Sequence, residues 1–207
     1  MNIKELFVES IMDNRKLIIG LYVIFIIVFI ASWIIIAPRM ESLVESAQVS
    51  SAPSVETSAV ELFIHNEWSG IVTYFGSVFF AIPAVVMVFY NGFNIAAMGP
   101  LFAKIIPNGA IMYMLYLIPH GIFEITGMIL QSAAGILLFL FVWRFIKAWR
   151  SSDTDGASDA FGMTKKVLIQ SVVLMVIATV LTLVAAPIES YVSIPFSQVI
   201  MGIFGLM

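Results

Sequence analysis

Residues 116–127, YLIPHGIFEITG, place a proline, a histidine and a glutamate between two long apolar runs. His120 and Glu124 are four residues apart, so a helix puts both side chains on one face. An imidazole and a carboxylate in that arrangement can hold a metal ion, relay a proton or pair with each other. Pro119 and Gly121 flank the histidine, and we expect them to open a helix there, because proline is tolerated in the first turn.

A second histidine and glutamate have the same spacing. His65 is the other of the two histidines in the chain, and Glu61 precedes it by four residues. Zinc accepts histidine nitrogen and carboxylate oxygen, so His65, Glu61, His120 and Glu124 form a candidate site for a divalent metal such as zinc. The alternative is that each pair only ties helix ends together and that the protein needs no cofactor. Neither pair forms the HExxH motif of zinc proteases.

Small and polar residues continue the face of His120 and Glu124. Three of them follow at helical spacing: Gly127, Gln131 and Gly135. Such a stripe is typical of a contact with another helix, because small residues let two backbones approach closely. A carboxylate near the bilayer centre costs about 2.5–3.5 kcal/mol. Glu124 therefore needs a partner, and His65 or Asn66 is the expected one.

The composition is that of an integral membrane protein. Of the 207 residues, 61% are hydrophobic and 11% are charged, whereas soluble domains are roughly half apolar and a quarter charged. The net charge of −3 gives no support to nucleic-acid binding. The absence of cysteine excludes disulfides and cysteine nucleophiles.

The apolar runs predict an all-α fold, a polytopic transmembrane helical bundle that forms a single integral membrane domain over residues 1–207. Residues 1–16 have the pattern of an amphipathic interfacial helix. The clear spans are residues 17–37, 70–90 (kinked by Pro83), 121–143 and 167–186. Residues 92–119 contain several prolines and glycines and should form a broken or re-entrant segment. The apolar tail, residues 194–207, should be interfacial or re-entrant.

Basic residues predict the topology. Eight of the ten lie before the first span or around residues 144–166: Lys4, Arg15, Lys16, Arg144, Lys147, Arg150, Lys165 and Lys166. The positive-inside rule places both groups in the cytoplasm, which requires an even number of crossings between them. We therefore expect about five crossings, a cytoplasmic N-terminus, an external loop at residues 38–60 and a cytoplasmic loop at residues 144–166. Within the external loop, Ser58 and Glu61 match a capping box that would restart a helix.

Three segments together resemble the stage II sporulation protein M family of integral membrane proteins. They are HNEWSGI (residues 65–71), NGFNIAAMG (91–99) and PHGIFEITGMILQSAAG (119–135). The order and spacing of an Asn, an Asn-Gly and a Pro-His-Gly-x-x-Glu motif match the family pattern. The residues that carry the match are Asn66, Asn91, Gly92, Pro119, His120, Gly121 and Glu124.

The resemblance implies a function without catalysis. In spore-forming bacteria the family member joins two cell-wall hydrolases in a membrane complex that remodels peptidoglycan. We therefore expect a scaffold or accessory subunit, not an enzyme, in the cell membrane. Its partners would be the lipid bilayer and other membrane proteins or further copies of itself. The alternative is a small oligomeric channel or transporter whose path is lined by His120, Glu124 and Gln131.

Overall fold

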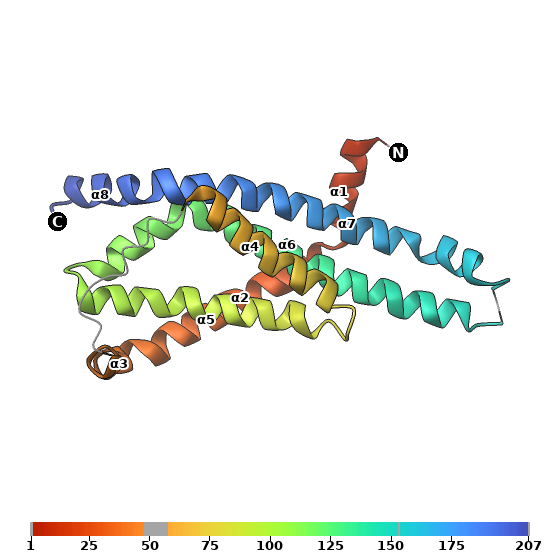
Figure 1. Cartoon of the computed structure of the whole chain (residues 1–207), viewed down its shortest axis with the longest axis horizontal. Coiled ribbons are helices and arrows are strands. Elements are labelled where there is room, and N and C mark those ends of the chain that lie inside the picture. The colour runs from red at the N-terminus through yellow and green to blue at the C-terminus, as the bar shows by residue number, and fades with distance from the viewer. Residues whose placement is uncertain (1, 48–57, 153, 207) are drawn as a thin grey trace.

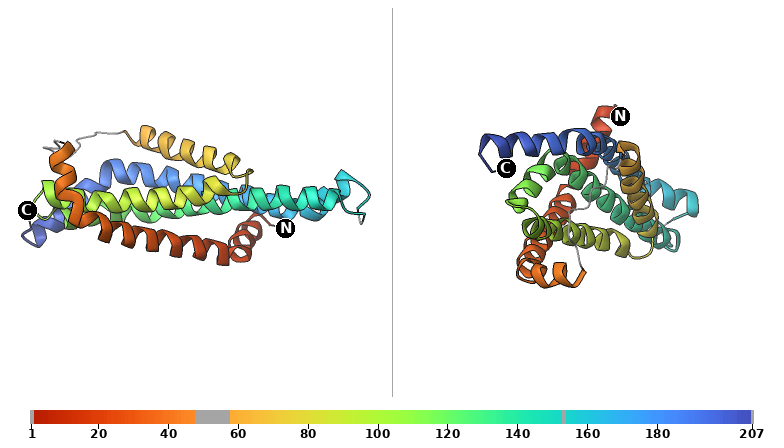
Figure 2. Two further views of the ribbon diagram at one scale, coloured as in Figure 1. Left: turned by 90° about the horizontal axis from the view of Figure 1, so that it is seen from below. Right: turned by 60° about the vertical axis from the view of Figure 1, so that its left-hand side comes forward.

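The computed structural model describes residues 2–47, 58–152 and 154–206, and the regular elements in these ranges are all helical (Figure 1). The long helices run roughly along one axis, as two further views confirm (Figure 2). The elements are α1 (Ile3–Asp13), α2 (Arg15–Ile36), a 3₁₀ turn (Ala37–Arg39), α3 (Met40–Ala47), α4 (Ala59–Gly76), α5 (Ile82–Ile105), α6 (Gly109–Trp149), α7 (Ala157–Ile188), a π-helical turn (Glu189–Ser193) and α8 (Ile194–Ile203). The all-α prediction is confirmed.

Four helical stretches in the described ranges are long and apolar enough to cross a membrane. They are Arg15–Ser42, Ile82–Ile105, Gly109–Trp149 and Ala157–Ile203. The shorter α4, which carries Glu61 and Glu67, lies obliquely across α6 and α7 (Figure 1). With four candidate spans in the described ranges, the expected polytopic membrane bundle is confirmed.

The predicted second span, residues 70–90, is wrong as a single helix. The chain instead turns back over residues 77–81, between α4 and α5. Phe80 and Ala81 adopt left-handed backbone conformations there, with φ of 64° and 57°. Pro83 lies in the first turn of α5, so it starts a helix instead of kinking one.

The break expected within residues 92–119 is present, at residues 106–108 between α5 and α6. Asn108 has a left-handed φ of 55°. Gly109 follows in a position where a Cβ atom would lie 1.9 Å from the carbonyl oxygen of Phe102, so only glycine fits without rearrangement. The segment therefore consists of the ends of two long helices and not of a re-entrant hairpin.

The predicted loop at residues 144–166 is largely helical. α6 continues to Trp149 and α7 begins at Ala157, which leaves a short connection at residues 150–156. Arginine and lysine are good helix formers, so the basic residues extend the helices instead of ending them. The extended ends of α6 and α7 pair with each other and project beyond the other helices (Figures 1 and 2).

The predicted loop at residues 38–60 contains the short helix α3, which lies across the bundle axis at the opposite end from the α6–α7 connection (Figure 1). Lys104 of α5 holds α3 through an ion pair with Glu41, with Nζ 2.9 Å from Oε2. Residues 48–57 of this loop lie outside the described residues. α4 then starts with the predicted capping box, in which Ser58 and Glu61 bond to each other's backbone.

The two ends of the chain form helices. The amphipathic segment 1–16 contains α1, which crosses the bundle axis (Figure 1) and is fixed by Asp13. Oδ2 of Asp13 lies 2.9 Å from Nζ of Lys166 and accepts a 2.8 Å hydrogen bond from Nε2 of Gln170, both on α7. At the other end, α8 follows α7 through the π-helical turn and lengthens it instead of turning back along the bundle (Figure 1).

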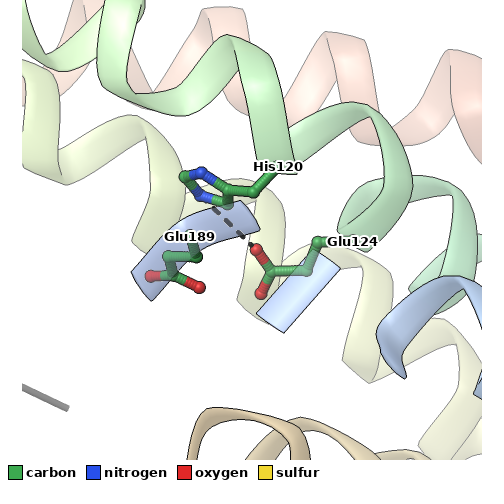
Figure 3. A group of neighbouring side chains, drawn as sticks. All are labelled: His120, Glu124 and Glu189. Atoms are coloured by element: carbon green, nitrogen blue, oxygen red, sulfur yellow. Dashed lines mark ion pairs between the residues drawn. The ribbon is translucent and has the colours of Figure 1, made fainter. Parts of the chain in front are cut away.

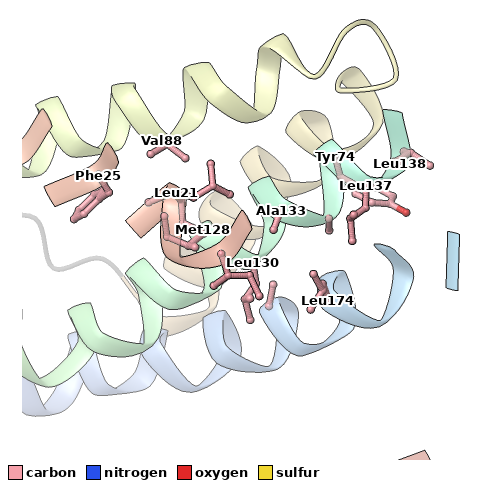
Figure 4. Packing of buried hydrophobic residues seen from close by; sticks show 14 residues of the cluster. Leu21, Phe25, Tyr74, Val88, Met128, Leu130, Ala133, Leu137, Leu138 and Leu174 are labelled. Atoms are coloured by element: carbon pink, nitrogen blue, oxygen red, sulfur yellow. The ribbon is translucent and has the colours of Figure 1, made fainter. Parts of the chain in front are cut away.

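The core of the bundle is built around α6. In the most apolar 18-residue stretch of α6, 61% of the residues are buried, whereas the corresponding stretch of α2 has 17% buried. α6 therefore lies at the centre of the bundle and α2 at its edge. Ile129 of α6, Leu174 of α7 and Val88 of α5 are fully buried in one cluster (Figure 4). α6 contacts α2, α4, α5 and α7, and three polar residues of its middle part are buried: His120, Gln131 and Ser132.

Candidate functional site

Pro119 lies inside α6 and does not open a helix, contrary to the prediction. A proline in this position removes one backbone hydrogen bond and bends the helix, and α6 changes direction in its first half (Figure 1). Gly121 is also inside α6, where its missing side chain accommodates Leu117 of the preceding turn. The motif is therefore a bend in a continuous helix.

His120, Glu124 and Glu189 form a cluster beside this bend (Figure 3). Each offers one ligand atom, and these atoms all lie within 4.8 Å of one another. Nε2 of His120 is 3.8 Å from Oε2 of Glu124. The histidine side chain is buried, whereas the Glu124 side chain remains 27% exposed. The pair on one face of α6 was expected, and Glu189 completes it from the other side.

The π-helical turn after α7 brings Glu189 and Ser193 to the cluster. Nδ1 of His120 lies 2.8 Å from Oγ of Ser193, and the hydroxyl of Tyr116 donates a 2.9 Å hydrogen bond to Oε1 of Glu189. Pro187, inside α7 just before the turn, has no amide hydrogen for the helical ladder. Irregular turns of this kind are frequent at functional sites.

The cluster is tied to α4 through Asn66. Nδ2 of Asn66 donates a 3.1 Å hydrogen bond to Oε1 of Glu124. The structure thus brings together the two residues that were expected to be partners. His65 lies outside the group of ligand atoms, and Glu61 caps the start of α4. The candidate metal set therefore changes, with Glu189 in place of His65 and Glu61.

Gln131 belongs to a second polar network, deeper in the bundle. Its Nε2 donates a 3.2 Å hydrogen bond to Oε2 of Glu67 on α4. Oε1 of Glu67 accepts a 2.6 Å hydrogen bond from Oγ1 of Thr179 on α7. A Cβ atom on Gly70 would lie 2.1 Å from Nε2 of Gln131, so the glycine makes room for the glutamine. The network joins α4, α6 and α7 inside the membrane-spanning region.

The expected tight contacts of Gly127 and Gly135 are present. A Cβ atom on Gly127 would lie 3.0 Å from Oγ1 of Thr182 on α7. One on Gly135 would lie 2.8 Å from Oγ of Ser77, in the turn between α4 and α5. The small residues of α6 therefore admit close neighbours on two sides.

A small cavity of about 110 Å³ lies between the two networks. Asn66, Glu124 and Gln131 line it, together with Asn91 and His65. Asn91 also donates from Nδ2 to the carbonyl oxygen of Met87 in its own helix, at 3.0 Å. Gly92, in contrast, faces away from the site: a Cβ atom there would lie 3.0 Å from Cγ1 of Val28 on α2.

Sequence reasoning missed four polar partners: Glu67, Tyr116, Thr179 and Ser193. The partner of each lies on another helix, at least 64 positions away in the sequence. Glu67 had a detectable signal, because a carboxylate within an apolar helix needs a partner as much as Glu124 does. Ser193 had none, because a π-helical turn cannot be read from hydropathy.

Comparison with known proteins gives one match. The family model described as stage II sporulation protein M matches residues 21–194, which is more than half of the chain. No curated protein and no solved structure matches significantly.

Proposed function

This chain belongs to the stage II sporulation protein M family, and we propose that it is a non-enzymatic membrane scaffold or accessory subunit. It anchors or organises a membrane complex that remodels the cell envelope. The family match and the four long apolar helices support its placement in a membrane. The choice between a scaffold and a transporter depends on whether the polar side chains of the bundle pair with one another or line a path.

The observation that carries the proposal is the pairing of the polar side chains between helices. Glu67 bonds to Gln131 and Thr179, and Glu124 bonds to Asn66. A scaffold uses such contacts to fix its helices, whereas a transporter keeps polar groups in a wide, wet path. The cavity beside Glu124 is only about 110 Å³, which suits the first use.

The surface for a partner lies at the projecting end of α6. Trp143 and Trp149 are 58% and 56% exposed there. Aromatic side chains are enriched at the centres of protein interfaces. Another membrane protein or a second copy of this chain would cover them. In the proposed orientation this end is cytoplasmic, together with the N-terminus, because it carries most of the basic residues.

The alternative function is a small oligomeric channel or transporter. One observation favours it: the cavity is lined by Glu124 and Gln131, and Glu124 is partly exposed. Copies assembled around this side of the bundle could extend the cavity into a path.

One pair of experiments separates the two functions. The tagged chain is solubilised from native membranes, and the mass and composition of its complex are measured. The scaffold proposal expects a fixed ratio to an envelope-remodelling protein, which Trp149→Ala reduces. Ile34→Ala, which removes an exposed apolar side chain of α2, serves as the control and leaves the ratio unchanged. The purified chain is also reconstituted in liposomes. Ion or solute flux that Glu124→Gln abolishes would instead establish the transport function.

A further inference from the structure

The cluster of His120, Glu124 and Glu189 contains two carboxyl groups and an imidazole but no lysine or arginine. It lies in helical stretches long enough to cross a membrane, where unpaired charge is costly. In the described part of the chain, no ion pair joins Glu124 or Glu189 to a lysine or arginine. Two ionised carboxylates beside a neutral imidazole carry two negative charges. A single divalent cation would cancel them.

The hydrogen bonds of Ser193 orient the imidazole for ligation. The serine hydroxyl has one hydrogen, and it donates this to the carbonyl oxygen of Ile188 at 3.2 Å. In the tautomer with the ring hydrogen on Nδ1, Oγ accepts from Nδ1 of His120, 2.8 Å away. Nε2 is left with a lone pair that points toward the carboxylates. Metal-binding histidines are oriented by the same kind of bond from the other ring nitrogen.

Each carboxylate accepts a side-chain hydrogen bond at one of its two oxygens. Asn66 bonds to Oε1 of Glu124, and Tyr116 bonds to Oε1 of Glu189. A hydrogen-bond donor on one carboxylate oxygen fixes the direction in which the other oxygen points, as it does around known metal sites. Oε2 of Glu124 is the oxygen that faces Nε2 of His120, at 3.8 Å.

We propose that His120, Glu124 and Glu189 bind one divalent transition-metal ion, with Nε2 and one oxygen of each carboxylate as ligands. With bonds of about 2.0–2.1 Å, the ligand atoms of a tetrahedral zinc ion are about 3.3–3.5 Å apart. The ligand atoms here lie within 4.8 Å of one another, so small side-chain rotations suffice. Three protein ligands leave a fourth position for water, on the exposed side of Glu124.

The ligand types select the metal class. Imidazole nitrogen with carboxylate oxygen suits Zn²⁺ and related ions such as Co²⁺. Mg²⁺ retains its waters and prefers oxygen ligands alone, so it should bind weakly. The site is independent of the scaffold role, because the ion could hold α6 and the end of α7 together in a protein of either function.

The test uses the full chain in detergent or nanodiscs, stripped with a chelator and then titrated with ZnCl₂. We expect one zinc per chain by elemental analysis after desalting, and a visible Co²⁺ spectrum of a four-coordinate site. Glu189→Gln should lose more affinity than the about 10- to 100-fold expected when only an orienting residue is removed. Ser193→Ala, which keeps all three ligands, should fall within that range.

His65→Ala is the matched control, because it removes the chain's other histidine and leaves the cluster intact. It should bind zinc as the wild type does. Saturable binding that is equal in Glu189→Gln and wild type would overturn the proposal, as would equal loss in His65→Ala. If a variant fails to fold, the wild-type titration still decides, because the absence of saturable binding there also refutes the site.

Discussion

Asn66 donates a 3.1 Å hydrogen bond to Glu124, although 58 positions separate the two residues in the chain. The bond joins α4 to the bend of the central helix α6. About two turns further along α6, Gln131 bonds to Glu67, the residue after Asn66, and makes a second bond between the same two helices. α4 is thus held by adjacent polar residues, Asn66 and Glu67, in a region where apolar contact alone gives little specificity.

Removal of the Asn66 amide should destabilise the bundle. In Asn66→Ala, Oε1 of the partly exposed Glu124 loses its donor, and the loss of such a hydrogen bond costs about 0.5–1.5 kcal/mol. We expect a lower midpoint of thermal unfolding in detergent, measured with metal removed so that the two effects stay separate. Ser69→Ala is the control: its hydroxyl bonds only within α4, to the carbonyl oxygen of His65. Equal midpoints for Asn66→Ala and wild type would show that the bond does not contribute.

Addition of one methyl group at Gly70 should disrupt the deeper network. The new Cβ atom would lie 2.1 Å from Nε2 of Gln131, so the glutamine must move and Glu67 loses its bond. We expect Gly70→Ala to cost about 1–3 kcal/mol, the range for overpacking. Gly20→Ala in α2 is a matched control, because a Cβ atom there has no neighbour within 4 Å. That change should be neutral or slightly stabilising. A stable Gly70→Ala protein would contradict the close packing of the two helices.

Thiol labelling tests the orientation in the membrane. The chain has no cysteine, so single cysteines can be introduced without background. Ser42 lies in α3 and Ser152 in the α6–α7 connection, at opposite ends of the bundle (Figure 1). We expect an impermeant reagent to label Ser42→Cys in intact cells, and Ser152→Cys only after permeabilisation. The reverse pattern would invert the topology, and labelling of both in intact cells would exclude a transmembrane arrangement of these ends.

Packing of α1 against α7 should weaken in acid. The ammonium group of Lys166 hydrogen-bonds to Asp13 and, with the amide of Gln170, holds the pKa of Asp13 below its ordinary value. A lowered pKa stabilises the folded arrangement above the ordinary value of about 3.9, and this stabilisation is lost as the pH falls toward the folded-state pKa. The effect should be small, because the ion pair is exposed to solvent.

Spin labels at Met12 and Met163, both exposed, would report the distance between α1 and α7. We expect the distance distribution to broaden in the wild type as the pH falls below about 4, and to be independent of pH in Asp13→Asn. Asp159→Asn, at the start of α7, should behave as the wild type. The same pH response with and without Asp13 would assign the change to another group.

Much of the fold could be predicted from hydropathy and from local signals. The first span, the capping box at Ser58 and the break before Gly109 each depend on residues close in sequence. The turn at residues 77–81 could not be predicted, because it lies within an apolar run and uses Phe80 and Ala81 in left-handed conformations that neither residue favours. Without this turn, the end of α4 and the first part of α5 are predicted as one kinked span, residues 70–90.

Only the part of the candidate site that lies on α6 could be predicted from the sequence. Helical spacing alone puts His120 and Glu124 on one face, and the cost of a buried carboxylate demands a partner such as Asn66. Glu189 and Ser193 join them only because a π-helical turn follows Pro187, which is a tertiary outcome. His65 and Glu61, the candidate ligands on α4, lie outside this group of ligand atoms.

The projecting ends of α6 and α7 form a hairpin of fixed length beyond the other helices. The 41 residues of α6 have a contour length of about 61 Å, roughly twice the hydrocarbon thickness of about 30 Å. Stacked aromatic rings stiffen this end: Phe145 packs on Phe141 and on Trp149 along α6, and Phe161 of α7 meets Phe141 edge to face. In the proposed scaffold, this hairpin would set the distance between the bilayer and a bound partner. Deletion of one helical turn from each arm would move that partner about 5 Å closer to the membrane without altering the surface that holds it.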